Sequence, residues 1–206
     1  LDTGAVACWG EADAGRLGYG NTTDIGDNEV PAANSAHGGL VPLGTGVRAV
    51  GITAGYQHTC VVTDAAKVVC WGRGSEGQLG YGNQNAIGDD ETPAALAATG
   101  VALPGIPAQV TAGTYHTCAL LTIGRVTCWG QAVDGQLGYG NQTAIGDNET
   151  PAANPVGGGL VHLGFFGFSS LPVTVTAIDA GAFHTCVVLA SNGVKCWGYG
   201  SAGRLG

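Results

Sequence analysis

The chain has 206 residues, of which 38 are glycine and only 11% are charged, and its formal net charge is −8. The 45% hydrophobic content and four Trp residues exclude a disordered linker, and the lack of a Gly-x-y period excludes collagen. The acidic balance makes nucleic acid and anionic membrane surfaces poor partners, and no apolar run reaches the ~18 residues of a membrane-spanning helix.

Sequence motifs recur four times along the chain, at offsets of 62, 58 and 68 residues. The triplet Cys-Trp-Gly opens each copy, and Gly-[Arg/Gln]-Leu-Gly follows it closely. This self-similarity indicates a module of about 60 residues, with three complete copies and partial ends, and hence a fragment of a longer repeat array. The predicted divisions are 1–46 (partial repeat and loop), 47–104 (repeat), 105–172 (repeat with a long loop) and 173–206 (truncated repeat).

Cys8 is the odd member of the seven cysteines. The residues before it correspond to the second half of a hairpin that joins two cysteines in the later copies. We expect Cys8 to be unpaired because truncation has removed the strand that carries its partner.

A loop with the pattern Gly-Asn-x-x-x-Ile-Gly-Asp follows in three copies and gathers oxygen donors. Calcium takes six to eight oxygen ligands and suits an extracellular protein, so it is the one cofactor that the sequence suggests. The alternative is that these side chains hydrogen-bond to their own backbone or to the next blade. The candidate ligands are Asn21, Asp27 and Glu29; Asn83, Asp89 and Glu91; and Asn141, Asp147 and Glu149.

Short β-favouring runs form the rest of each module. A first strand is predicted at Val47–Thr53, 109–111 and Val173–Ile178, and each run leads to Ala-Gly. Two further runs follow, separated by turn residues such as Asp64-Ala65-Ala66, which is typical of a hairpin. No helical period is sustained, so the fold class is all-β. Small antiparallel sheets at this period favour a β-propeller, in which each blade buries both faces on its neighbours.

The hairpins carry cysteines separated by nine residues. Opposed residues of an antiparallel hairpin lie close enough for a disulfide, so this spacing predicts three bridges. Each closes a loop of about ten residues and contributes roughly 3 kcal/mol in the chain-entropy account. The predicted pairs are Cys60–Cys70, Cys118–Cys128 and Cys186–Cys196.

Histidine and tryptophan recur beside these cysteines. Each His-x-Cys pair offers two zinc-ligand types, but a disulfide with a structural histidine is favoured because closely spaced cysteine pairs are missing. The tryptophan of each Cys-Trp-Gly is interpreted as packing between blades, with an aromatic wall for sugars or peptides as the alternative. A nucleophile is disfavoured because no module offers a separate base.

The stretch between modules varies in length, and a binding loop is not required to recur. Its longest version, 157–171, contains three of the four Phe residues. An aromatic cluster in a Gly/Ser loop indicates a partner-binding anchor, whereas the alternative is a flap folded onto its own blade. The residues concerned are Phe165, Phe166 and Phe168.

The combination of Ala-Gly-x-x-His-Thr-Cys, a hairpin, Cys-Trp-Gly and Gly-Gln-Leu-Gly resembles the regulator-of-chromosome-condensation repeat, in its cysteine-paired, secreted bacterial form. The resemblance covers essentially the whole chain. It implies a β-propeller, usually seven-bladed, in which one sequence repeat straddles two blades. The nucleotide-exchange activity and chromatin binding of the founding member do not carry over, because no segment matches the exchange loop and the charge is acidic.

These patterns predict a non-enzymatic protein, secreted or at the cell surface, that acts as a protein-binding or scaffold module through propeller loops. The expected partner is a protein or a further copy of the chain, with no nucleic acid and no membrane insertion. The alternative is a structural subunit of an extracellular filament or ring that assembles through its repeat edges.

Overall fold

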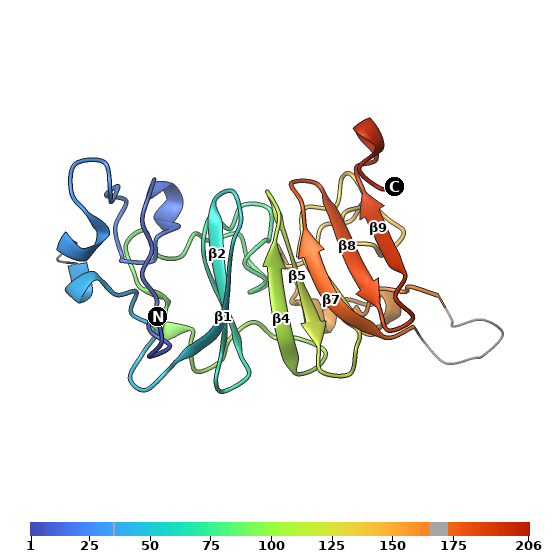
Figure 1. Cartoon of the computed structure of the whole chain (residues 1–206), viewed down its shortest axis with the longest axis horizontal. Coiled ribbons are helices and arrows are strands. Elements are labelled where there is room, and N and C mark those ends of the chain that lie inside the picture. Colours follow the sequence, from blue (N-terminus) through green and yellow to red (C-terminus); the bar gives the residue numbers. More distant parts are fainter. Residues whose placement is uncertain (35, 165–172) are drawn as a thin grey trace.

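The computed structural model describes residues 1–34, 36–164 and 173–206, and it is all-β, as predicted (Figure 1). Three antiparallel sheets of three strands stand side by side along the long axis of the molecule. Each sheet is formed by strands that follow one another directly in the chain. The sheets comprise β1 (Ala49–Ala54), β2 (His58–Thr63) and β3 (Val68–Gly72); β4 (Pro107–Ala112), β5 (His116–Leu121) and β6 (Val126–Gly130); and β7 (Val175–Ala180), β8 (His184–Leu189) and β9 (Val194–Gly198).

The register is the same in all three sheets. In the central sheet Cys118 pairs with Cys128 and Thr117 with Trp129, so the chain order His-Thr-Cys lies opposite Cys-Trp-Gly. A bulge interrupts the first strand of each sheet, for example between Pro107 and Gln109. The first strands begin two residues from the predicted starts and end one or two residues later than predicted, at the alanine of Ala-Gly.

Only short 3-10 turns accompany the strands, and within residues 1–34, 36–164 and 173–206 no α-helix forms. Prolines begin three of these turns, where a fixed φ and a missing N–H are tolerated. No helix in the described residues is long and apolar enough to cross a membrane. The turns are η1 (Asp13–Gly15), η2 (Pro31–Ala33), η3 (Ala36–Gly39), η4 (Pro93–Ala95), η5 (Pro151–Ala153), η6 (Val156–Gly159) and η7 (Ser201–Gly203).

The first two sheets also receive an outer segment from the chain that follows each of them. The N–H of Val101 donates to the carbonyl of Val68 at 2.8 Å, and the N–H of Val161 donates to that of Val126 at the same distance. The N–H of Val41 bonds in the same way to Val6, which lies on the segment leading to Cys8. Within the first 46 residues, Val41 thus lies beside Val6 as Val101 lies beside Val68.

The core lies between the sheets. Every residue of β2, β3, β5 and β6 is buried, whereas β9 at the end of the row is exposed or half-buried. The difference follows from position, since inner sheets are covered on both faces and the last sheet on one. The three sheets are blades of a β-propeller array, and each blade buries its apolar faces on its neighbours.

Candidate functional site

Three disulfides cross the hairpins at the cysteine pairs that the sequence spacing predicts. They join Cys60 to Cys70, Cys118 to Cys128 and Cys186 to Cys196, with Cα–Cα distances of 4.0 to 4.1 Å. Because the sulfurs are bonded to each other, no thiolate is left to complete the zinc site considered for the His-x-Cys pairs.

The histidine and threonine of His-Thr-Cys link one blade to the next. His58 Nε2 lies 2.8 Å from the hydroxyl of Thr117, which belongs to the following blade. That hydroxyl donates to the carbonyl of Gln78 at 2.8 Å. His116, Thr185 and the carbonyl of residue 136 repeat the arrangement, with both distances at 3.0 Å.

This chain of bonds determines the state of the histidines. The proton of the Thr117 hydroxyl is used on the carbonyl of Gln78, so His58 must donate from Nε2 and its Nδ1 carries no proton. Burial lowers the pKa of His58 to about 3, and nearby His116 adds to the effect. Burial likewise lowers the pKa of His116 to about 4. His58 and His116 are therefore neutral at neutral pH and act as structural hydrogen-bond donors.

The glycine of Ala-Gly-x-x-His makes room for the imidazole. A Cβ added to Gly113 would lie 2.2 Å from His116 Cε1 and 2.6 Å from the carbonyl oxygen of Gly181. Gly55 and Gly181 contact their own histidines in the same way. The motif therefore encodes a contact between blades, in which glycine provides space, histidine donates and threonine accepts.

Tryptophan packs between the blades, as its regular recurrence suggests. Trp71 and Trp129 are fully buried, and the indole N–H of Trp129 donates to the carbonyl of Gln78 at 2.9 Å. At about 25 cal/mol per Å², burying the 150–250 Å² of an indole contributes about 4 to 6 kcal/mol. The hydrogen bond adds about 1 kcal/mol, so packing dominates and the bond orients the ring.

The tyrosine after Gly-Gln-Leu-Gly bonds the last strand of the first two hairpins. The phenol of Tyr81 accepts the N–H of Cys70 at 2.9 Å and lies 3.1 Å from its carbonyl oxygen. Tyr139 makes the same pair of contacts with Cys128 and also bonds the carbonyl of Gly159 at 3.0 Å. Tyrosine thus satisfies backbone groups on the outer side of the third strand, which is a structural role.

In the loops proposed for calcium, some of the side-chain oxygens accept hydrogen bonds from the backbone. The side-chain oxygens of Asn21, Asn83 and Asn141 each accept the N–H of the residue two positions ahead, at 3.0 to 3.1 Å. Successive loops are also bonded to each other, since the N–H of Gly20 donates to the carbonyl of Gly88 at 3.1 Å. Both contacts fit the alternative to calcium binding, in which the loops cap their own backbone and bond to the next blade.

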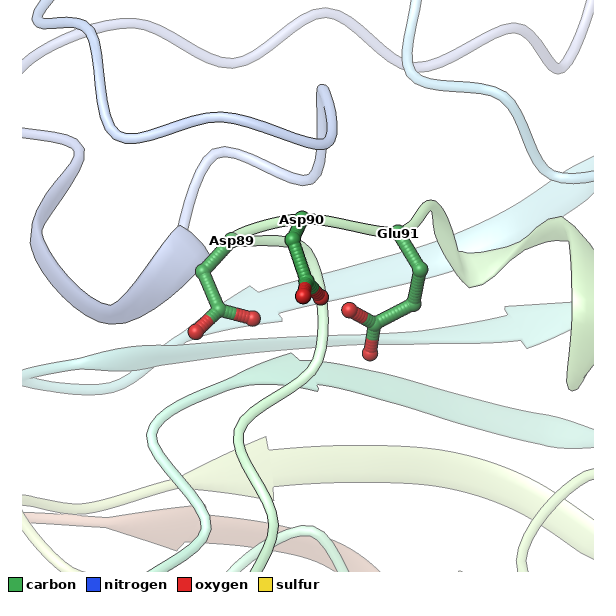
Figure 2. Close-up of side chains that lie close together, drawn as sticks. All are labelled: Asp89, Asp90 and Glu91. Carbon is green, nitrogen blue, oxygen red and sulfur yellow. The ribbon is translucent and has the colours of Figure 1, made fainter.

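One of the three loops brings carboxylates together. In the described part of the chain, the only cluster of three or more acidic, His or Cys side chains with metal-ligand spacing is formed by Asp89, Asp90 and Glu91, whose ligand atoms lie within 4.8 Å of one another (Figure 2). Burial raises the pKa of Glu91, and Asp90 and Asp89 raise it further. Calcium at these loops stays a prediction, with this cluster as its best-placed donor set.

Cys8 is unpaired and half-buried, and burial raises the pKa of its thiol to about 11. The neighbouring Trp9 is 63% exposed, in contrast to the fully buried Trp71 and Trp129. The edge around Cys8 is thus an uncovered version of a surface that is buried elsewhere in the array.

A set of exposed and half-buried rings that the sequence analysis missed lies at one end of the sheets. Tyr56 and Tyr115, on turns of adjacent blades, meet edge to face with centroids 6.2 Å apart, and Arg73 lies 5.7 Å from the ring centre of Tyr115. Phe183 and Tyr199 form a second pair at 6.5 Å. Arg204 covers Tyr199 at 4.9 Å. We call this set the aromatic rim; it comprises Tyr56, Arg73, Tyr115, Phe183, Tyr199 and Arg204.

Five of the six rim residues occupy positions that vary between repeats. They lie in the x-x of Ala-Gly-x-x-His or directly after Cys-Trp-Gly, whereas Arg204 belongs to the repeated Gly-[Arg/Gln]-Leu-Gly segment. The β4–β5 and β7–β8 turns and the end of β9 lie along the upper edge of the row of sheets in Figure 1. Variation at these positions between repeats was the sequence signal that could have identified the rim. The other predicted binding element, Phe165, Phe166 and Phe168, lies outside the described residues.

Family comparisons agree with the motifs. The sequence profile described as "Regulator of chromosome condensation (RCC1) repeat" matches residues 3–62 and 67–120, and a second profile of the same repeat matches 49–78, 108–136 and 175–204. The ultraviolet-B receptor UVR8 of Arabidopsis thaliana is 32% identical over 209 residues, covering 100% of this chain and 40% of the receptor. The human E3 ubiquitin-protein ligase HERC2 is 34% identical over 204 residues, covering 99% of this chain and 4% of the ligase.

Solved structures show the same fold at lower identity. Human WBSCR16 superposes with a TM-score of 0.62 at 19% identity, covering 93% of this chain and 42% of WBSCR16. Yeast RCC1 (Prp20), in a structure with Kap60 bound, gives 0.60 at 18% identity, covering 93% of this chain and 39% of Prp20. The chain spans less than half the length of these relatives. With repeat-profile matches over more than half of its residues, the chain belongs to the regulator of chromosome condensation (RCC1) repeat family.

Proposed function

We propose that this chain is a non-catalytic protein-binding module whose binding face is the aromatic rim. The observation that carries the proposal is the gathering of four aromatic rings and Arg73 at positions that vary between repeats, with Arg204 covering the last ring. Tyr and Arg are enriched among the residues that dominate binding energy at protein interfaces. Tyr56 is 61% exposed and Tyr199 is 43% exposed, so both have surface to bury on a partner.

The scaffold beneath the rim supports binding because it is constrained at both ends of each turn. The turn that carries Tyr115 lies between β4 and the disulfide-bonded strand β5, and the N–H of Thr114 donates to the carbonyl of Ala182 on the next blade at 2.9 Å. A partner therefore meets rings whose backbone is already ordered, which lowers the entropy cost of association.

The relatives support protein binding as a class of function. The yeast relative was solved with Kap60 bound, which is a protein complex on the same fold. We propose an extracellular or cell-surface location because three disulfides in a chain of this size are typical of oxidising compartments.

Self-association through the repeat edges is the second candidate. It is favoured by exposed apolar side chains at both ends of the row, namely Trp9 at 63% and Val194 at 65% exposure. Light scattering over a concentration series separates the two candidates, because edge-to-edge assembly gives a mass that grows with concentration and a binding module gives one constant mass.

Site-specific photo-crosslinking tests the rim directly. A photoreactive phenylalanine that replaces Tyr115 lies on the rim. The same photoreactive residue in place of Ile123, which is 63% exposed, lies on the turn at the other end of β5 and is the control. The proposal predicts a discrete crosslinked protein from position 115 in the native extracellular fraction and none from position 123. Equal crosslinking from both positions, or crosslinking from position 123 alone, contradicts it.

A further inference from the structure

The outer loops of the three repeats contain the same hydrogen-bonded turn. In each loop the side-chain oxygen of an asparagine accepts the N–H of the residue two positions ahead, at 3.0 to 3.1 Å. The three segments are Asn21-Thr22-Thr23, Asn83-Gln84-Asn85 and Asn141-Gln142-Thr143. The first and third have the pattern Asn-x-Thr, which is the acceptor signal for N-linked glycosylation in secreted proteins, whereas the second has asparagine in place of threonine.

This turn is exposed even where a loop has neighbours on both sides. The middle loop is bonded to the preceding one, because the N–H of Gly20 donates to the carbonyl of Gly88 at 3.1 Å. It is also bonded to the following one, because the N–H of Gly82 donates to the carbonyl of Gly146 at 3.1 Å. Residues 83–85 are nevertheless exposed, as are the equivalent residues 141–143. Exposure of the turn is thus a property of the repeat and does not depend on the ends of the chain.

The atoms that a glycosylation reaction uses have no other partner in the protein. Asn141 uses its side-chain oxygen in the turn, and within the described residues neither its Nδ2 nor the hydroxyl of Thr143 forms a hydrogen bond. The half-buried Asn21 and the exposed Thr23 are arranged in the same way. A sugar on Nδ2 therefore breaks no contact of the fold and leaves the turn intact. The Nδ2 of Asn154, by contrast, is buried, and no Asn-x-Thr pattern begins there.

A third Asn-x-Thr pattern begins at Asn148 and lacks these features. No hydrogen bond joins Asn148 to Thr150 in the part of the chain that the structure describes. Thr150 is half-buried and stands directly before Pro151, the first residue of η5. The turn thus distinguishes two of the three Asn-x-Thr patterns in the chain.

We propose that Asn141 and Asn21 carry N-linked oligosaccharides. The inference rests on the extracellular location proposed above, because the sugar is added in a secretory pathway. The donor is a lipid-linked oligosaccharide diphosphate, and an oligosaccharyltransferase catalyses the transfer. The asparagine Nδ2 attacks the anomeric carbon of the sugar, so that a C–N bond forms and the bond from that carbon to the phosphate oxygen breaks. The lipid diphosphate leaves with the electron pair, and Nδ2 loses one proton.

Peptide mapping of the native protein from the extracellular fraction tests the proposal. Peptide-N-glycosidase in heavy-oxygen water converts a glycosylated asparagine to labelled aspartate, and a digest without the glycosidase controls for spontaneous deamidation. We expect label at Asn21 and Asn141 and none at Asn83 or Asn148. Extracellular protein with neither label nor sugar-bearing peptides at Asn21 and Asn141 overturns the proposal, as does modification of Asn148 alone. Absence of the protein from this fraction refutes the location and this inference with it, whereas crosslinking at Tyr115 tests the rim separately.

The middle loop provides a matched control for the role of the turn. The full chain is secreted from a host that carries an oligosaccharyltransferase, and its glycans are counted by intact mass before and after the glycosidase. Asn141→Gln should lose one glycan, and Asn85→Thr should gain one at Asn83, because this loop has the same turn and exposure. Asn85→Ala should leave the number unchanged. Secreted, folded Asn85→Thr protein without a glycan at Asn83 would contradict the assignment of the turn as an acceptor.

Discussion

The hydroxyl of Thr117 is the most informative group to remove, because it links two blades. It accepts from His58 Nε2 at 2.8 Å and donates to the carbonyl of Gln78 at 2.8 Å, and all three groups are buried. Thr117→Val keeps nearly the same shape. The lost bond to Gln78 costs about 1 kcal/mol, and the buried N–H of His58 left without an acceptor costs about 1–3 kcal/mol more. The free energy of unfolding should therefore fall by about 2–4 kcal/mol.

The equivalent change at the open edge is the matched control. Thr59 donates to the carbonyl of Arg16 at 2.9 Å, but no histidine donates to it, and that carbonyl keeps the indole of Trp71 at 3.0 Å. Thr59→Val should cost only about 1 kcal/mol. Urea unfolding of both variants, followed by circular dichroism without reductant, measures the difference. Equal losses in the two variants would refute the assigned link between blades.

The burial of His58 and His116 makes the stability of the fold depend on pH. Unfolded histidine binds a proton below about pH 6.5, while folded His58 and His116 stay neutral to about 3 and 4. The unfolded chain then binds more protons, so stability should fall by about 3 kcal/mol from pH 6.5 to 5 in urea titrations, and a His58→Gln variant should show about half that loss. Gly113→Ala should lower stability by about 1–3 kcal/mol, because its Cβ would lie 2.2 Å from the ring of His116, whereas Gly193→Ala, with its nearest contact at 3.6 Å, should be close to neutral in the same assay. The calcium interpretation predicts that excess calcium raises the Tm of the wild type and not of Asp90→Asn, and the same Tm in calcium and in chelator would contradict it.

The fold could be predicted from the sequence because every repeat carries the same local signals. Each hairpin is marked by two cysteines, turn residues and Cys-Trp-Gly, and the spacing of Cys118 and Cys128 alone sets the register of β5 and β6. Local chain geometry was sufficient for these pairings.

The roles of the remaining motif residues depend on contacts that a single repeat does not contain. His58 and Thr117 are 59 residues apart, so neither the tautomer of the histidine nor the need for threonine could be derived from one module. The phenol of Tyr81 bonds the backbone of Cys70 across 11 residues, through a loop whose path the pattern does not define. For the same reason, the composition of the acidic loops does not determine whether their side chains bond to the backbone or bind a metal.

The aromatic rim was missed because its residues do not recur at one repeat position. Tyr56 occupies the first variable position of Ala-Gly-x-x-His, whereas Tyr115 and Phe183 occupy the second. The structure brings these rings to one end of neighbouring blades, and only then do they form a surface.

The central claim is that the repeat-fixed residues build a scaffold and the rim binds a protein. Its most direct test is the affinity of the crosslinked partner for wild type, Tyr115→Ala and Ile123→Ala, measured by calorimetry after each variant has been matched for Tm. Loss of a central interface tyrosine typically costs about 2 kcal/mol or more, so Tyr115→Ala should bind roughly 30-fold more weakly and Ile123→Ala as tightly as wild type. Unchanged affinity of Tyr115→Ala together with weakened binding by Ile123→Ala would contradict the assignment.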